Sequence, residues 1–360
     1  MNPNQYFKLF ACCIPVKGAT KSLLCDLQRN SYCEIPNSLY TILTDFQKNT
    51  FGELVAQFDD EETLLEYFNF LVSNEFGFFT TKPDLFPELT REWYHPSVIT
   101  NAIVDTDDRS RHDYLRIFEN LDKVGCVDLQ MRFFGRGISN EELDKLLRLL
   151  SGSSIATVEL ILPFSDSFSE EAIKEICHQH QRVGKITFYR APEEKFTKVY
   201  GGDPSHLFAQ IFFTKQVIDS HAHCGQIDPW YFILSTKGFM ESQQHNSCLN
   251  RKVGISPDGE IRNCPSLPDA YGNINEISIL EAISKKDFTK LWFIHKDEIN
   301  VCMDCEFRHM CTDCRAFLSD PEDLYSKPAK CGYDPYKGVW TAENDLQKTL
   351  TEKAITASDR

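Results

Sequence analysis

The spacing of hydrophobic residues changes along the chain and divides the sequence into parts of different structure. Over residues 6–35, short apolar runs flank turn sequences such as PVKGAT, a pattern typical of β-strands. From Leu39 to Val72, apolar residues recur every three or four positions, which predicts three short amphipathic helices. Together with the closing run FGFFT, these elements predict a small strand-then-helix domain over residues 1–90.

From residue 97, apolar and β-branched runs alternate with helical patterns. The runs are VITNAIV, CVDLQMRFF, IATVELIL, KITFYR and AQIFFT, and helix-like segments separate the first four. Strands that alternate with helices of this length predict βαβ units, a mostly parallel sheet and right-handed crossovers. Residues 91–220 are therefore expected to form an α/β domain with its functional groups at the carboxyl ends of the strands.

Residues 221–335 have weak helical periodicity and are rich in Gly, Pro, Asn, Asp and Cys. A segment with so little continuous apolar sequence cannot build a large core, so it needs a covalent or metal staple. Its cysteines are the obvious candidates. Residues 336–360 are polar and are expected to form a tail that is either a docked helix or frayed.

Composition and charge narrow the functional classes. The 360 residues are 42% hydrophobic and carry a formal charge of −15. This predicts a folded protein and argues against nucleic acid as a partner, because a phosphate backbone attracts clustered Lys and Arg. The first residues lack a signal-peptide pattern, and no run of about 18 apolar residues occurs. We therefore expect a cytoplasmic protein with no membrane partner, in which cysteines bind metal more often than they form disulfides.

Eight of the 14 cysteines fall within residues 224–331. They are Cys224, Cys248, Cys264, Cys302, Cys305, Cys311, Cys314 and Cys331. Four thiolates suit both a tetrahedral zinc ion and a [4Fe–4S] cluster, so the number of ligands alone does not choose between them. The turn sequence PDG before Cys264 folds the chain back toward Cys248. The run from Cys302 to Cys314 is too dense for one metal centre, so one of its thiols is expected to reach a neighbouring centre.

The remaining six cysteines lie in strand-like or helical apolar patterns and are expected to be buried, inert thiols. They are Cys12, Cys13, Cys25, Cys33, Cys126 and Cys177.

The cysteine pattern resembles the seven-cysteine SPASM motif at the C-terminus of radical-SAM peptide-modifying enzymes, with G-x4-C at Gly259 followed by the dense run. The resemblance implies two auxiliary [4Fe–4S] clusters. One would be held by Cys302, Cys305, Cys311 and Cys331. The other would be held by Cys248, Cys264 and Cys314, with Cys224 in SHAHCGQ as the candidate fourth ligand. The family run has three residues between its last two cysteines, whereas this chain has two. Zinc is the alternative metal.

The resemblance also implies that the middle of the chain is a partial (β/α) barrel of the radical-SAM type. That class needs C-x3-C-x2-C after the first barrel strand, but this chain reads DTDDRSRHDYLR there and contains no cysteine. Asp105, Asp107, Asp108 and His112 could replace the missing thiols as ligands, but carboxylates suit hard metal ions and not an open iron–sulfur cluster, so a solvated loop and helix start are expected. We therefore expect a barrel kept as a scaffold, without S-adenosylmethionine chemistry.

The whole chain resembles the SPASM-domain peptide maturases of grasp-with-spasm systems, through FACCIPVKGATKSLLCDLQRNSYCEIP, HCG, NSCLNRKVGISPDGEIRNCPS, VCMDCEFRHMCTDCRAF and KPAKCGYDP. The resemblance implies an ATP-grasp ligase and a ribosomally made precursor peptide as partners. It also implies a PqqD-like, winged-helix-type N-terminal domain that binds the leader peptide as an added strand. The matching surfaces would be the strand around SLLCDLQ and the helix carrying Leu64, Phe68 and Leu71. The alternatives are a redox enzyme with an incompletely ligated cluster and a zinc-stapled interaction protein.

Overall fold

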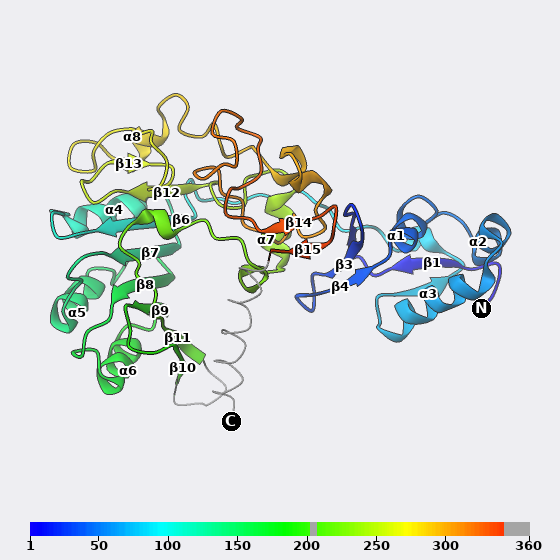
Figure 1. Cartoon of the computed structure of the whole chain (residues 1–360), viewed down its shortest axis with the longest axis horizontal. Coiled ribbons are helices and arrows are strands. Elements are labelled where there is room, and N and C mark those ends of the chain that lie inside the picture. The colour runs from blue at the N-terminus through cyan, green and yellow to red at the C-terminus, as the bar shows by residue number, and fades with distance from the viewer. Residues whose placement is uncertain (202–206, 342–360) are drawn as a thin grey trace.

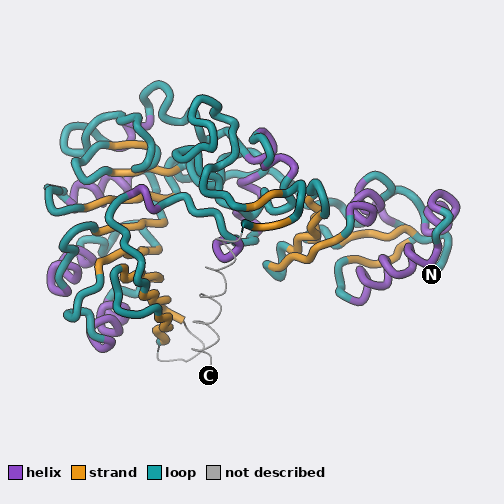
Figure 2. The backbone as a smooth tube through the Cα atoms, in the orientation of Figure 1, coloured by secondary structure: helices purple, strands orange, loops and turns teal. Residues whose placement is uncertain are grey.

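The computed structural model describes residues 1–201 and 207–341. Most of the predicted tail, residues 342–360, lies outside this part of the chain. The described residues form a helical lobe, a strand–helix layer and, between them, a region built mainly of loops (Figures 1 and 2).

The N-terminal part follows the predicted order of strands and helices. Its elements are β1 (Tyr6–Leu9), β2 (Cys13–Val16), β3 (Ser22–Asp26), β4 (Ser31–Ile35), α1 (Asn37–Thr44), α2 (Phe51–Phe58), α3 (Glu61–Ser73) and β5 (Gly77–Thr80). Helix α2 begins at a capping box, in which the Thr50 hydroxyl accepts from the Glu53 N–H and the Glu53 carboxylate accepts from the Thr50 N–H. Such a cap stabilises a helix by ~1 kcal/mol. Asp60 caps α3 by accepting from the Thr63 N–H.

Strands β2, β3 and β4 form an antiparallel sheet whose central strand, β3, is buried on both faces. Because successive side chains of a strand point to opposite faces, Leu24 and Ile35 pack in the core of the helical lobe. Leu23 and Cys25 pack in a second core that also contains Phe307 of the cysteine-rich region. The sheet therefore joins the N-terminal lobe to the cysteine-rich region.

The expectation that a leader peptide docks on the SLLCDLQ strand is wrong. This segment forms β3, which pairs with β2 on one side and β4 on the other, and every residue of β3 is buried. Leu64, Phe68 and Leu71 also point into the core of the helical lobe. Of the two outer strands, β2 is buried and contains Pro15, which has no N–H to donate. The solvent-exposed edge of this sheet belongs to β4.

The middle of the chain forms the predicted alternation of strands and helices. Its elements are β6 (Asn101–Thr106), α4 (Tyr114–Lys123), β7 (Asp128–Phe133), α5 (Asn140–Arg148), β8 (Thr157–Pro163), α6 (Glu170–Gln179), β9 (Val183–Tyr189), β10 (Lys195–Tyr200) and β11 (Leu207–Phe213). The sheet has eight strands in the order β10-β11-β9-β8-β7-β6-β12-β13. The pairs from β11 to β12 are parallel, and the outermost pair at each end is antiparallel. Strands β12 (Lys252–Ile255) and β13 (Ile261–Arg262) come from beyond residue 220.

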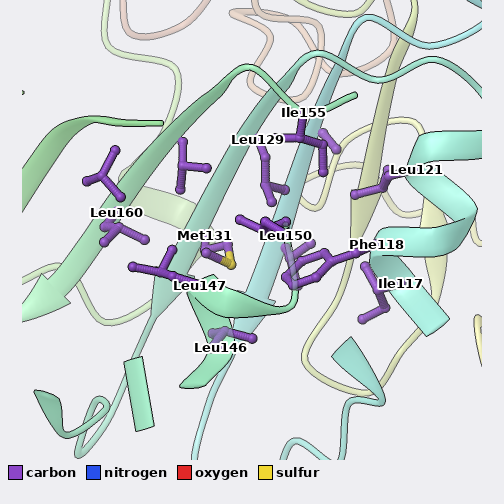
Figure 3. Close-up of a cluster of buried hydrophobic side chains, with 14 of the residues drawn as sticks. Ile117, Phe118, Leu121, Leu129, Met131, Leu146, Leu147, Leu150, Ile155 and Leu160 are labelled. Atoms are coloured by element: carbon purple, nitrogen blue, oxygen red, sulfur yellow. The ribbon is translucent and has the colours of Figure 1, made fainter. Parts of the chain in front are cut away.

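The two faces of this sheet differ in polarity. Side chains such as Met131 and Leu160 meet Phe118 of α4 and Leu147 of α5 in the main apolar core (Figure 3). On the opposite face, a hollow of about 340 Å³ is lined mainly by polar residues, among them Asp128, Gln130, Glu159, Lys185 and Lys252. The sheet is therefore a scaffold with one packed face and one polar, open face.

The cysteine-rich region contains little regular structure, as its weak periodicity predicts (Figure 2). Its elements, besides β12 and β13, are α7 (Thr236–Ser242), α8 (Ile279–Ile283), β14 (Tyr333–Asp334) and β15 (Val339–Trp340). Single turns of 3-10 helix span Pro83–Leu85, His221–His223, Pro229–Tyr231, Lys296–Glu298 and Cys302–Asp304. Within the described ranges, no helix has both the length and the apolar composition that a bilayer crossing requires.

Candidate metal centre

A β-hairpin brings Cys248 and Cys264 toward each other. Strands β12 and β13 pair antiparallel around the PDG turn, in which the Gly259 N–H donates to the Ser256 carbonyl at 2.9 Å. The Asn263 side chain donates to the carbonyls of Leu249 (3.0 Å) and Lys252 (2.8 Å). The residues next to both cysteines are thereby tied together, and the predicted fold-back at the PDG turn is confirmed.

Cys224 and Cys314 lie beside the hairpin cysteines. A Cβ atom added at Gly225 would lie 2.9 Å from the Cys314 Sγ, so this position next to Cys224 needs glycine. Burial raises the pKa of Cys314, and electrostatic interaction with the neighbouring Cys248 and Cys224 raises it further. We call Cys224, Cys248, Cys264 and Cys314 the first thiol group.

Lys252 places a positive charge beside the first thiol group. Its ammonium donates to the Cys248 Sγ at 3.2 Å. Burial alone would lower the pKa of Lys252, but electrostatic interaction with Cys248, Cys264 and Cys224 raises it above its usual value. Conversely, burial raises the pKa of Cys264 to about 12, so this thiol is protonated in the metal-free protein at neutral pH. A bound metal must therefore displace its proton.

The dense cysteine run forms tight turns that bring most of its thiols together in a second group. The Cys305 N–H donates to the Cys302 carbonyl at 3.0 Å, and the Cys311 N–H donates to the Phe307 carbonyl at 3.0 Å. Burial raises the pKa of Cys311 to about 12; Lys296 opposes this rise, whereas Cys331 and Cys302 add to it. Burial likewise raises the pKa of Cys305, with contributions from Cys311 and Cys302. We call Cys302, Cys305, Cys311 and Cys331 the second thiol group.

A buried network of charges supports the second thiol group. Lys296 is 4% exposed, and its ammonium lies 3.4 Å from the Cys311 Sγ, 3.9 Å from the Cys302 Sγ and 3.6 Å from the Asp313 carboxylate. Asp313 also accepts from Arg315 at 2.8 Å and from the Asn246 amide at 2.6 Å. Lys296 therefore places a buried ammonium beside two of these thiols, and its positive charge favours their thiolate forms.

The sequence patterns did not reveal these charged partners. Lys252, Lys296 and Arg315 resemble ordinary surface cations when read along the chain, because their neighbours in space come from distant segments. Asp313 offered a weak local signal, because it is one of three carboxylates enclosed in the dense cysteine run. His223 pairs with Asp219 at 3.0 Å on the surface and makes no contact with the thiol groups that the described residues show.

The spacing of the eight predicted ligands can be compared with the spacing that a single tetrahedral ion requires. A tetrahedral zinc ion with Zn–S bonds of about 2.3 Å holds its sulfurs about 3.8 Å apart. Among the described residues, no three of the eight predicted ligands have their Sγ atoms within 4.8 Å of one another. These thiols therefore do not form a ready-made tetrahedral site for a single ion, and metal binding itself stays a prediction.

An ion pair fills the carboxyl ends of β6 and β7, close to the first thiol group. Arg132 binds Asp105 with two hydrogen bonds of 2.6 and 2.7 Å, and both side chains are buried. Burial would lower the pKa of Arg132, but Asp105 raises it, and Cys224 and Cys264 add to the rise. The first thiol group therefore faces this end of the sheet.

Polar residues of the loop after β6 form hydrogen bonds with nearby backbone groups. Asp107 accepts from the N–H groups of Arg109 and Ser110, and Asp108 accepts from the Arg136 N–H. The His112 ring contacts the Asp105 carbonyl at 2.8 Å. The expected solvated loop is confirmed for residues 107–113, but it is wrong for Asp105, which is a buried residue of β6 that pairs with Arg132.

Replacing Gly225 with alanine should selectively disturb the first thiol group. Gly225 has φ of +84°, and the added methyl group would clash with Cys314. Gly152→Ala is the matched control, because Gly152 has φ of +87° and nothing lies within 4 Å of its added Cβ. Both variants should lose ~1–2 kcal/mol of stability through backbone strain, but only Gly225→Ala should lose bound metal, measured by elemental analysis. Equal metal content in the two variants would contradict this placement of Cys314.

Comparisons with known proteins leave the family open. No protein-family model and no curated protein sequence matches the chain. Among solved structures, it is similar to Streptococcus suis SuiB bound to S-adenosylmethionine, with 11% identity, a TM-score of 0.36, and coverage of 91% of this chain and 98% of that chain. It is similar to SuiB bound to precursor peptide SuiA, with 12% identity, a TM-score of 0.37, and coverage of 92% and 99%. Likeness at this level decides neither family nor function.

Proposed function

We propose that this chain is a peptide-presenting adaptor that carries two [4Fe–4S] clusters and acts with an ATP-grasp ligase on a ribosomally made precursor peptide. The observation that supports the proposal is a lysine ammonium beside each predicted ligand set: the Lys252 ammonium donates to the Cys248 Sγ, and the Lys296 ammonium lies 3.4 Å from the Cys311 Sγ. The first thiol group would hold one cluster and the second thiol group the other. A cluster bound at either place would supply a rigid staple and a one-electron redox centre.

The electrostatics of both groups support an anionic occupant. Four thiolates give a [4Fe–4S] cluster a net negative charge, which a nearby ammonium stabilises, most strongly where water is excluded. Lys296 is buried against the second thiol group, and Lys252 donates to the first. Hydrogen bonds to cluster sulfurs also adjust the reduction potential. The two lysines would therefore hold the clusters and tune them.

The carboxyl ends of the parallel strands support a role without S-adenosylmethionine cleavage. That chemistry needs a cluster with an open iron after the first barrel strand, and the loop from residue 107 to 113 contains no thiol to hold one. The Arg132–Asp105 ion pair instead occupies the carboxyl ends of β6 and β7, where it is buried. In this proposal the sheet positions the core of the peptide, and the ligase performs the ATP-dependent bond formation.

The contact between the N-terminal lobe and the second thiol group supports the adaptor role. The turn after β2 lies on the cysteine run, where Arg308 donates to the Lys17 carbonyl and the Ala19 N–H donates to the Asp304 carbonyl at 2.8 Å. A leader peptide added to the exposed edge of β4 would therefore be connected, through the sheet of β2, β3 and β4, to the cluster proposed at the second thiol group. Strand addition supplies main-chain hydrogen bonds whatever the leader's side chains are.

Leader binding should protect the backbone amides of β4 from hydrogen exchange. Residues 31–35 form the outer strand, so their outward N–H groups gain partners only when a peptide strand is added. Amides of β3 serve as the internal control, because they already lie between two strands. Mass spectrometry of the full chain with and without leader peptide makes the measurement. Protection of another segment, with none in β4, would place the leader elsewhere.

The adaptor role is tested by reconstituting the reaction from purified ligase, precursor peptide and this chain. We expect slow modification by the ligase alone and a large increase in rate when the chain is added with its clusters loaded. Excess free leader peptide, added as a competitor, should displace the leader of the precursor peptide from the N-terminal strands and return the rate to that of the ligase alone. The same rate with and without the chain would contradict the adaptor role.

A further inference from the structure

Two neighbouring cysteines and an aspartate converge at a place that the two thiol groups do not include. The Sγ atoms of Cys12 and Cys13 and a carboxylate oxygen of Asp26 all lie within 4.8 Å of one another. Cys13 is the cross-strand partner of Asp26, so both side chains lie on the same face of the sheet. Cys12 precedes β2 in a turn, and its carbonyl accepts from the Leu27 N–H at 2.9 Å. The β2–β3 pairing thus fixes all three positions.

The distances and the donor types match a single zinc ion. The two Sγ atoms are 4.0 Å apart, close to the spacing of about 3.8 Å that tetrahedral zinc imposes on two thiolates. A fourth donor is at hand, because the Gln28 side-chain oxygen lies 3.7 Å from the Cys12 Sγ. Two sulfurs with two oxygens suit zinc, which accepts both kinds of ligand, better than they suit Mg²⁺ or Ca²⁺.

The charges at this place are balanced once zinc is bound. Two thiolates and one carboxylate carry three negative charges, zinc brings two positive charges, and Arg29 supplies the third from 3.3 Å away at Asp26 Oδ2. Asp26 is 1% exposed, so an unbalanced charge there would be costly. Its other oxygen, Oδ1, accepts from the N–H groups of Gln28 and Arg29. These bonds orient the carboxylate and leave Oδ2 with a free lone pair.

We propose that Cys12, Cys13 and Asp26 bind one Zn²⁺ ion, with Gln28 as the fourth ligand. Cys13 lines a cavity of about 180 Å³ in the N-terminal lobe, which gives the ion a route to its ligands. The ion would pin the turn between β3 and β4 and so hold the exposed strand β4 in place. Cys12 and Cys13 are then ligands and not the inert thiols that their apolar sequence context predicts.

Zinc content measured on the iron-loaded full chain tests the proposal. Loading the chain with iron and sulfide first keeps other thiols occupied. After equilibration with zinc and removal of the excess, we expect about one zinc per wild-type chain and at least tenfold less in Cys12→Ser and Cys13→Ser. Cys33→Ser is the matched control, because Cys33 is a half-buried thiol of the same sheet outside the group, and it should retain its zinc. Zinc retained equally by all four proteins, or by none, would overturn the proposal.

Cobalt substitution provides a readout that does not depend on how well the serine variants fold. Co²⁺ bound to two thiolates in tetrahedral geometry gives sulfur-to-metal charge-transfer bands and intense visible bands. We expect these bands in the wild-type chain and weakened cobalt binding, by tenfold or more, in Asp26→Asn, which keeps the size of the side chain. Octahedral cobalt bands without charge transfer would overturn the proposal. Iron content is measured in the same samples, so a failure of the proposed clusters is seen separately from a failure of this site.

Discussion

Asp105→Ala should destabilise the protein by about 3–5 kcal/mol, since it leaves the Arg132 guanidinium buried without a counter-charge. Arg132 and Asp105 are 4% and 0% exposed and share two short hydrogen bonds between the neighbouring strands β6 and β7. Urea unfolding followed by circular dichroism measures the loss.

Two controls make this prediction specific to a buried, unpaired charge. Asp269→Ala breaks the Asp269–Lys290 pair, whose side chains are about half exposed, and should cost less than ~1 kcal/mol. The double variant Asp105→Leu with Arg132→Met removes both charges and should recover much of the stability. If Asp105→Ala costs no more than Asp269→Ala, the pair does not have the structural role described above.

Cys248→Ala and Cys311→Ala should each remove about half of the bound iron. The two residues belong to different thiol groups, and a [4Fe–4S] cluster that loses a thiolate from its protein ligands is held poorly. The double variant should therefore bind almost no iron. Iron and acid-labile sulfide per chain are measured on anaerobically purified protein, together with the absorbance of the cluster near 400 nm.

Cys177→Ala is the control for the two cysteine variants. Cys177 is fully buried in the apolar core of the strand–helix layer, so its loss leaves a small cavity and changes stability, not iron content. Loss of all iron in Cys248→Ala alone would mean that the thiols serve one shared centre. Unchanged iron in both single variants would mean that neither thiol is a ligand.

Hydrophobic periodicity predicted the order of elements well, because the apolar residues that define each element also bury it. The strands β6 to β9 and the helices α4 to α6 lie where the alternating runs placed them. Strand β10 was not predicted. It is an edge strand whose side chains are mostly part-exposed, and its sequence KFTKVY therefore contains few apolar residues. The central position of β3 in its sheet was not predicted either, because strand order depends on pairing between segments and not on the composition of one strand.

The cysteines themselves were visible in the sequence, but the charges around them were not. A thiol is rare enough that its spacing carries information, whereas Lys252, Lys296 and Asp313 belong to common residue types. Their significance comes from burial beside thiols that are distant along the chain. The zinc ligands Cys12 and Asp26 were missed for the same reason: the β2–β3 pairing brings them together across 13 intervening residues.

The division of eight thiols into two cluster-binding groups is the claim on which the proposed function depends. Iron, sulfide and zinc per wild-type chain, measured after anaerobic purification, test it most directly. We predict a brown protein with about eight iron and eight sulfide per chain, as two [4Fe–4S] clusters require. A colourless protein that holds zinc in place of iron at these cysteines would contradict the claim.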